Sequence, residues 1–154
     1  LIEKGIWIED TDKLNRTALF YAIKVQNVEY VSYLLKIGAS IQCVDSKGYL
    51  PIHYACKKGN EQIVLYLIDY GSDLNFVDSN GNTPIHIAMK YNYKECVRWL
   101  LVRGSRKDLP NNEGQKPVDI NRSNNCNEEL IKMVGSFDCT NIGKFIFFFF
   151  LIYI

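Results

Sequence analysis

The sequence predicts an all-α solenoid of helix–turn–helix units joined by short hairpin-like turns. Residues of one type return at steps of 33 positions, and each step contains two short apolar patterns with helical spacing. The two clearest ladders are Asp12, Asp45, Asp78 and Asn111, and Gly5, Gly38, Gly71 and Gly104. A period of about 20–50 residues is typical of stacked repeats, in which neighbouring units bury one continuous core.

The turn and first helix of a unit can be followed in the second unit. Gly48 can take the positive φ that a tight turn needs. Pro51 stands where the first turn of a helix tolerates a missing backbone N–H group. Ile52, Ala55 and Cys56 then recur at i, i+3 and i+4, which predicts one buried face of a short helix.

A second helix is predicted in the same unit, because Gly59 and Asn60 interrupt the first. Four apolar residues at i, i+1, i+4 and i+5 form its expected buried face: Ile63, Val64, Leu67 and Ile68. Gly71 is expected to end this helix in the left-handed region. Residues 74–78 then predict a short extended link to the next turn.

The period divides the chain into seven segments. They are the end of a truncated preceding repeat at 1–11, full repeats at 12–44, 45–77 and 78–110, a degenerate last repeat at 111–134, a linker at 135–144 and an apolar tail at 145–154. Leu1 falls inside the second helix of an earlier unit in this frame, which predicts a fragment of a longer array or a missing first exon. Asn121 replaces the small Ala of the other units, and a polar last unit is typical of a capping repeat.

Three short motifs identify the family that this pattern resembles. Residues 83–88 read T-P-I-H-I-A, residues 50–55 read L-P-I-H-Y-A, and residues 17–22 read T-A-L-F-Y-A. They resemble the T-P-L-H-x-A core of the ankyrin repeat, and the resemblance covers residues 1–134. It implies a non-catalytic protein–protein interaction module. It also implies that His53 and His86 bond the neighbouring backbone and connect adjacent turns, and that Asn15 substitutes for the turn glycine.

Composition and charge exclude several other classes. Apolar residues make up 47% of the 154 positions and charged residues 23%, which is typical of a globular chain. The net charge of +1 excludes a strongly basic or acidic tail. The five cysteines form no C-x-x-C pair, which favours free thiols in a reducing, intracellular compartment. No pattern of metal ligands, phosphate-binding loop or nucleophile is present, so we expect no catalysis, no metal and no cofactor.

The resemblance implies that a partner binds the concave surface, which the turn tips and the outer faces of the first helices form. The residues expected to contact it are Lys13, Arg16, Lys24, Lys47, Tyr49, Lys57, Lys58, Asn80, Asn82, Lys90 and Tyr91. They predict a basic groove for an acidic peptide or domain, on a cytoplasmic monomer that binds no nucleic acid. The acidic residues Glu29, Glu61, Asp69 and Glu95 map to the second helices on the convex side. The competing interpretation is a solvated face whose lysines serve solubility.

The tail at 145–154 leaves three interpretations open. It is the start of a transmembrane helix, the translation of AT-rich non-coding DNA, or an exposed apolar terminus that docks elsewhere. Ten apolar residues fall short of the roughly 17–20 that span a bilayer. The first interpretation allows an alternative function at the cytosolic face of a membrane. The chain would then be the recruitment module of a membrane enzyme, such as an ankyrin-repeat palmitoyltransferase whose catalytic part lies beyond Ile154.

Overall fold

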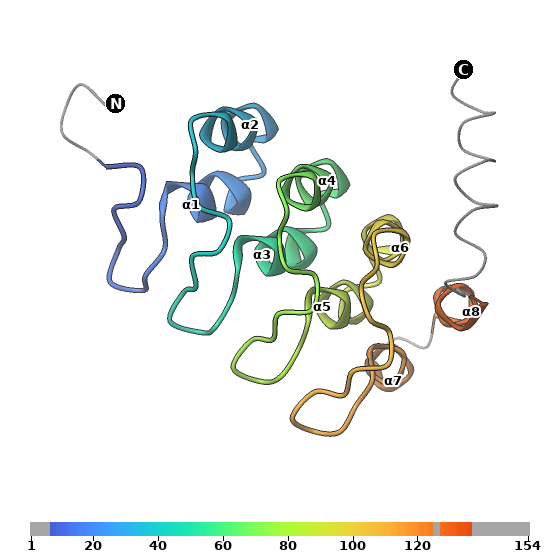
Figure 1. The fold of residues 1–154 in the computed structure, drawn as a ribbon. Coiled ribbons are helices and arrows are strands. Elements are labelled where there is room, and N and C mark those ends of the chain that lie inside the picture. Colours follow the sequence, from blue (N-terminus) through green and yellow to red (C-terminus); the bar gives the residue numbers. More distant parts are fainter. Residues whose placement is uncertain (1–6, 125–126, 137–154) are drawn as a thin grey trace, which may run out of the picture.

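The computed structural model describes residues 7–124 and 127–136, and within these residues it is entirely helical, without a β-strand. Its helices form two rows (Figure 1). The first helices of the units are α1 (Ala18–Lys24), α3 (Pro51–Lys58), α5 (Pro84–Lys90) and α7 (Pro117–Asn124). The second helices are α2 (Val28–Lys36), α4 (Glu61–Asp69), α6 (Lys94–Val102) and α8 (Glu128–Ser136).

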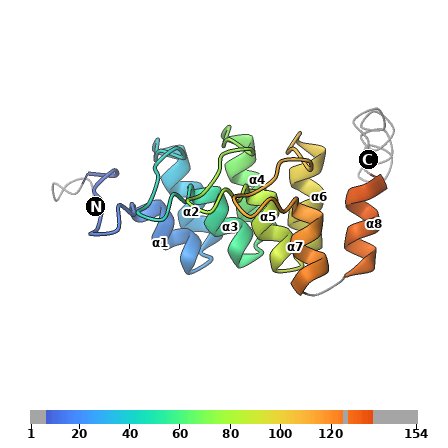
Figure 2. The ribbon, with the colours of Figure 1, turned by 90° about the horizontal axis from the view of Figure 1, so that it is seen from below.

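Each unit packs against its neighbours along one axis. In the first row α1 contacts α3, α3 contacts α5, and α5 contacts α7; in the second row α2 contacts α4 and α4 contacts α6. Figure 2 shows the units following one another from one end of the stack to the other. Such a stack buries a continuous core through contacts between neighbouring units. The predicted all-α solenoid is therefore confirmed.

Local signals set the helix ends. The Asn27 side chain accepts a hydrogen bond from Tyr30 N at 2.9 Å and so caps α2, while Asn60 caps α4 through Ile63 N at 3.2 Å. Pro51 occupies the first turn of α3, where its missing N–H group leaves no bond unmade.

The turns between units are joined backbone to backbone. Ser79 N donates to the Lys47 carbonyl at 3.2 Å, and Ser46 N donates to the Leu14 carbonyl at 3.0 Å. Gly48 has a φ of +76°, and a Cβ at this position would lie 2.8 Å from Ser79 N. Glycine is thus required at Gly48 both for the turn and for the close approach of the next turn.

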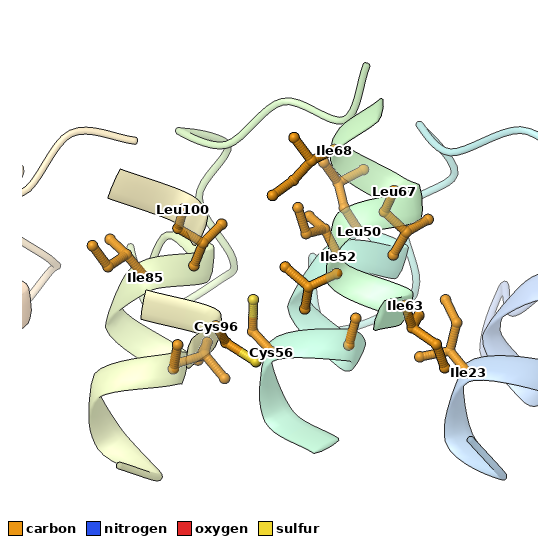
Figure 3. Packing of buried hydrophobic residues seen from close by; sticks show 14 of the residues in the cluster. Ile23, Leu50, Ile52, Cys56, Ile63, Leu67, Ile68, Ile85, Cys96 and Leu100 are labelled. Atoms are coloured by element: carbon orange, nitrogen blue, oxygen red, sulfur yellow. The ribbon is translucent and has the colours of Figure 1, made fainter. Parts of the chain in front are cut away.

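One cluster of buried apolar residues runs from Leu19 in α1 to Val134 in α8. Leu67 is fully buried at the centre of the array, between the helices of adjacent units (Figure 3). Cys56 and Cys96 are also buried in this cluster, as small apolar fillers. Burial raises the pKa of the Cys56 thiol well above its ordinary value and that of Cys96 to about 12, so neither thiol is a ready nucleophile.

His53 and His86 connect adjacent turns, as the family resemblance implies. His53 Nδ1 accepts the backbone N–H of Leu50 at 3.2 Å, so Nε2 carries the ring hydrogen and donates it to the Asn82 carbonyl at 3.2 Å. His86 repeats the arrangement with the Gln115 carbonyl at 3.2 Å. In the first unit Phe20 holds the histidine position, and its ring packs edge-on against Tyr54 at 5.1 Å.

The last unit differs from its prediction in two respects. The helix predicted to end at Val134 continues to Ser136, so the predicted linker at 135–144 begins inside α8. Asn121, predicted to be a sign of degeneracy, is fully buried and forms hydrogen bonds with the Met89 carbonyl, Asn92 Oδ1 and Asn127 N. The predicted tail at 145–154 and the start of the truncated repeat at residues 1–6 lie outside the described residues.

Candidate functional site

The candidate site is the face of the stack that the turns and the first helices share. We call it the turn-side surface: residues 12–16, 45–49 and 78–82, together with the outward sides of α1, α3 and α5. All the residues predicted to contact a partner lie on its turns, on these helices or directly after them. Lys13, Lys47 and Asn80 are exposed at the tips of the turns, whereas Lys58 is half-buried.

A row of three exposed lysines follows the ends of the first helices. Lys24, Lys57 and Lys90 lie in the last turns of α1, α3 and α5, one in each unit. Helices in contact are spaced by about 8–10 Å, so the row has one cation per such step. Lysine at a helix C-terminus also interacts favourably with the helix dipole, which gives this row a structural role of its own.

Two of these lysines lie over aromatic rings. Lys24 Nζ is 5.9 Å from the ring centroid of Tyr21, and Lys57 Nζ is 5.9 Å from that of Tyr49. Such contacts stabilise an exposed ammonium by about 0.5–1 kcal/mol and restrict its side chain. The turn-side surface therefore presents cations supported by aromatic rings.

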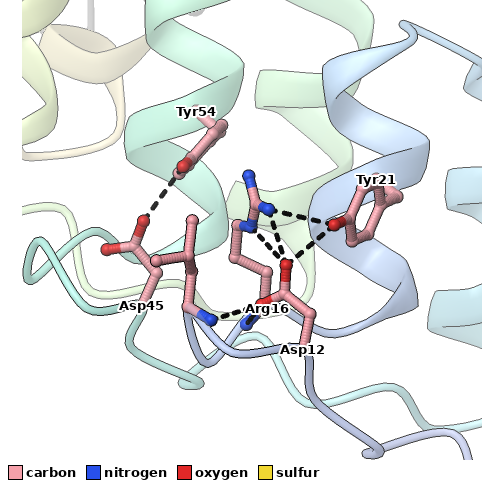
Figure 4. Close-up of polar contacts among 6 residues, drawn as sticks. Asp12, Arg16, Tyr21, Asp45 and Tyr54 are labelled. Carbon is pink, nitrogen blue, oxygen red and sulfur yellow. Dashed lines mark hydrogen bonds and ion pairs between the residues drawn. The ribbon is translucent and has the colours of Figure 1, made fainter.

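Arg16 is engaged within the first unit (Figure 4). Its Nε and Nη2 donate to Asp12 Oδ2 at 2.9 and 2.6 Å, and the Tyr21 hydroxyl donates to the same oxygen at 2.8 Å. The Arg16 hydrogen bonds hold the pKa of Asp12 well below its ordinary value, while donation to Asp12 raises the pKa of Tyr21. The charge of Arg16 is thus compensated inside the chain, and its predicted contact with a partner stays a prediction.

The second unit contains a related pair without the arginine. The Tyr54 hydroxyl donates to Asp45 Oδ2 at 2.9 Å (Figure 4), and the Tyr54 ring packs edge-on against Tyr49 at 5.6 Å. Burial, followed by this bond to Asp45, raises the pKa of Tyr54. Tyr49 stands where the first unit has Arg16, so an aromatic ring replaces the ion pair at this position.

The third unit replaces this network by other contacts. Asn82 holds the position of Arg16 and Tyr49, and its Oδ1 accepts from Asn111 Nδ2 at 3.0 Å. Asn82 thus links two turns and is half-buried, and its predicted contact with a partner stays a prediction. Tyr91 is 41% exposed and stacks on Tyr93 with 6.1 Å between the ring centroids.

The opposite side of the stack carries charges of both signs. Glu29 and Glu61 are exposed on α2 and α4, as predicted. Asp69 pairs with Arg103 at 2.8 Å, and Glu95 pairs with Arg98. This side is therefore mixed, while the exposed charges of the first three units on the turn-side surface are mainly lysines.

The sequence prediction missed Tyr21 and Tyr54, although both carry the polar network of this surface. The two tyrosines are 33 residues apart, and each hydroxyl meets the aspartate that opens its own unit. A search for tyrosine at the period of the repeat would have found the pair. The hydrogen bonds from these tyrosines to the aspartates could not be predicted from the period, because they depend on side-chain geometry.

The described residues form neither a metal-ion cluster nor a membrane span. They contain no group of three His, Cys, Asp or Glu side chains arranged to hold a metal ion. Within the same residues, no helix has the length and apolar character needed to cross a membrane.

Comparison with known proteins identifies the family. The family model described as ankyrin repeats (3 copies) matches residues 1–78, 37–111 and 70–136. A search of curated proteins finds no match. Ankyrin repeats generally mediate protein–protein interaction and are typically non-catalytic. The matched ranges, the helix pairs and the histidine-linked turns agree, and the chain belongs to the ankyrin-repeat family.

Proposed function

We propose that the chain binds an acidic segment of a partner protein on its turn-side surface. The observation that carries this proposal is the lysine row, in which Lys24 and Lys57 lie over tyrosine rings. An ammonium held over a ring loses less conformational freedom when a partner carboxylate binds it. The row is exposed along three successive units and therefore offers an extended line of positive charge.

The electrostatic argument depends on the row as a whole. A single exposed ion pair contributes only about 0.2–1 kcal/mol, so one lysine gives little affinity. Charges of one sign on one face add to a common field, which speeds the approach of an oppositely charged partner and orients it. Salt screens this field over about 10 Å at 0.1 M, so binding should weaken as the salt concentration rises.

The test compares two triple variants that remove equal charge from different faces. The row variant is Lys24→Gln, Lys57→Gln, Lys90→Gln, and the control variant is Lys36→Gln, Lys94→Gln, Lys132→Gln on α2, α6 and α8. The probe is a fluorescein-labelled peptide of alternating Asp, Glu and Gly residues, followed by fluorescence anisotropy. Three lost contacts of about 0.2–1 kcal/mol each should weaken binding to the row variant roughly tenfold.

The control variant should bind the probe as the native chain does. Equal losses in both variants would mean that total charge alone governs binding, and no binding to the native chain would mean that the lysines serve solubility. Thermal unfolding followed by circular dichroism verifies that both variants keep the fold. The alternative function, that of the recruitment module of a membrane enzyme, depends on the tail at 145–154, which lies outside the described residues, and it stays a prediction.

A further inference from the structure

We infer that the segment bound by the turn-side surface adopts the polyproline II conformation, with an acidic residue at every third position and proline between them. The inference rests on the proposed function and adds to it the conformation and register of the partner. Three features of the surface carry it: the spacing of the lysine row, an exposed or half-buried tyrosine in each unit, and the point at which the row ends.

The spacing of the row selects the conformation of the partner. Lys24, Lys57 and Lys90 occupy equivalent positions on first helices that contact one another, so the axes of the helices that carry successive lysines are about 8–10 Å apart. A polyproline II helix has three residues per turn with a rise of about 3.1 Å, which returns a side chain to the same face every ~9 Å. An acid at i, i+3 and i+6 therefore meets one lysine in each unit.

Other regular conformations fit this spacing less well. A β-strand returns a side chain to one face after about 6.7 Å or about 13 Å, and both distances miss the row. An α-helix returns a side chain to the same face after seven residues, a distance of about 10.5 Å. Helices, however, bind through a continuous apolar stripe in an apolar groove, whereas the exposed rings of this surface alternate with cations.

The second feature that favours a polyproline II partner is the tyrosine in each unit. Tyr21 is 42% exposed in the first unit, Tyr49 is half-buried in the second and Tyr91 is 41% exposed in the third. Surfaces lined by aromatic rings bind the proline rings of polyproline II segments, and this conformation has little entropy left to lose on binding. Each unit thus offers one cation for an acid, at the same repeat position, and one ring for a proline, at a repeat position that differs between the units.

The row ends after three units. In the fourth unit the sequence has Ser123 at the lysine position, and the exposed Glu113 occupies the turn-tip position that Lys47 holds in the second unit. Glu113 repels a further acid of the partner at this end. The matching segment is therefore about seven residues long, with its three acids facing Lys24, Lys57 and Lys90.

The experiment uses two labelled peptides of identical composition. The register peptide is Glu-Pro-Pro-Glu-Pro-Pro-Glu, and the shuffled peptide is Glu-Pro-Glu-Pro-Glu-Pro-Pro. Since no two acids of the shuffled peptide are three or six residues apart, it can align only one of them with the row, and the register peptide should bind about tenfold more tightly. Equal affinities would overturn the inference and leave the proposed function standing, because both peptides carry the same charge.

A charge exchange tests the register at its central position. Lys57→Glu should weaken binding of the register peptide about tenfold, and the peptide Glu-Pro-Pro-Lys-Pro-Pro-Glu should recover that loss on the variant. No recovery would place the central acid elsewhere and would contradict the assigned register. If neither proline peptide binds while the Asp, Glu and Gly probe does, the inference is wrong. If that probe also fails to bind, the proposed function is wrong as well.

Discussion

The ring of Tyr93 lies against Gly59, the residue that ends α3 in the neighbouring unit. A Cβ at residue 59 would come within 2.5 Å of Tyr93 Cδ1 and 2.6 Å of Cζ. Gly59 also has a φ of +74°, a conformation that costs other residues about 1–2 kcal/mol. The glycine thus meets a backbone requirement of its own unit and a packing requirement of the next.

Gly59→Ala is therefore expected to destabilise the protein by more than the conformational cost of about 1–2 kcal/mol alone. Urea unfolding measures the change in the free energy of unfolding. The double variant with Tyr93→Ala should be more stable than the sum of the two single losses predicts, because the second change removes the clash. Strict additivity would show that the ring moves aside without cost.

Leu67→Ala is expected to lower the free energy of unfolding by about 2–5 kcal/mol, through lost burial and a cavity. Leu67 is completely buried, with an accessible fraction of 0%. Because it lies in the central unit, the cavity weakens the contacts to both sides. A native-like urea midpoint in the variant would contradict this prediction.

Asn121→Ala restores the residue type of the other units but is expected to destabilise the last one by about 1–3 kcal/mol. The change removes the amide that bonds the Met89 carbonyl at 2.9 Å and the Asn127 backbone N–H at 2.9 Å, just before α8. Hydrogen exchange should show faster exchange of the α8 amides than in the native chain, with the central helices unchanged. A variant that is as stable as the native chain, or more so, would refute the bonding role.

Stability should fall as the pH drops below the ordinary histidine value of 6.5. Burial is the main cause that lowers the pKa of both His53 and His86 in the folded chain. The unfolded chain therefore binds more protons between 6.5 and the lower folded values, so the free energy of unfolding decreases with falling pH in that window and is constant above it.

Urea unfolding at a series of pH values between about 5 and 8 tests this dependence, above the range where carboxylates titrate. The double variant His53→Asn, His86→Asn should be less stable than the native chain but should show a nearly constant stability over the same range. A native chain with constant stability there would mean that the folded histidines accept protons as readily as the unfolded ones.

The sequence predicted those features that recur at the same position in each repeat. The period located both helices of each unit, the buried position of Leu67 and the left-handed turn at Gly71, whose φ is +90°. These features follow from one rule, since equivalent residues of stacked units have equivalent surroundings. The ends of the helices were predicted less accurately, because a final turn such as that at Ser136 depends on local hydrogen bonds more than on the repeat.

Pairings that occur in only one or two units could not be predicted in this way. Arg16 reaches Asp12 only in the first unit, because Tyr49 and Asn82 replace it in the next two. In the sequence Asn121 is only a replacement of the alanine found in the other units, whereas in the structure it bonds Met89 and Asn127. Such contacts depend on the side-chain geometry of particular residues, and a repeat pattern averages over those residues.

Backbone hydrogen bonds join successive turns, so the spacing of the units depends little on the exposed side chains that a partner would contact. Ser46 N, Ser79 N and Asn112 N each donate to a carbonyl of the preceding turn, and the side chains of Ser79 and Asn112 add bonds to the same turns. Lys47 contributes its carbonyl to this series, while its side chain extends into solvent. A tip side chain that takes no part in these bonds, such as that of Lys47, can therefore be substituted without changing the spacing of the units, so the binding surface can change while the scaffold stays the same.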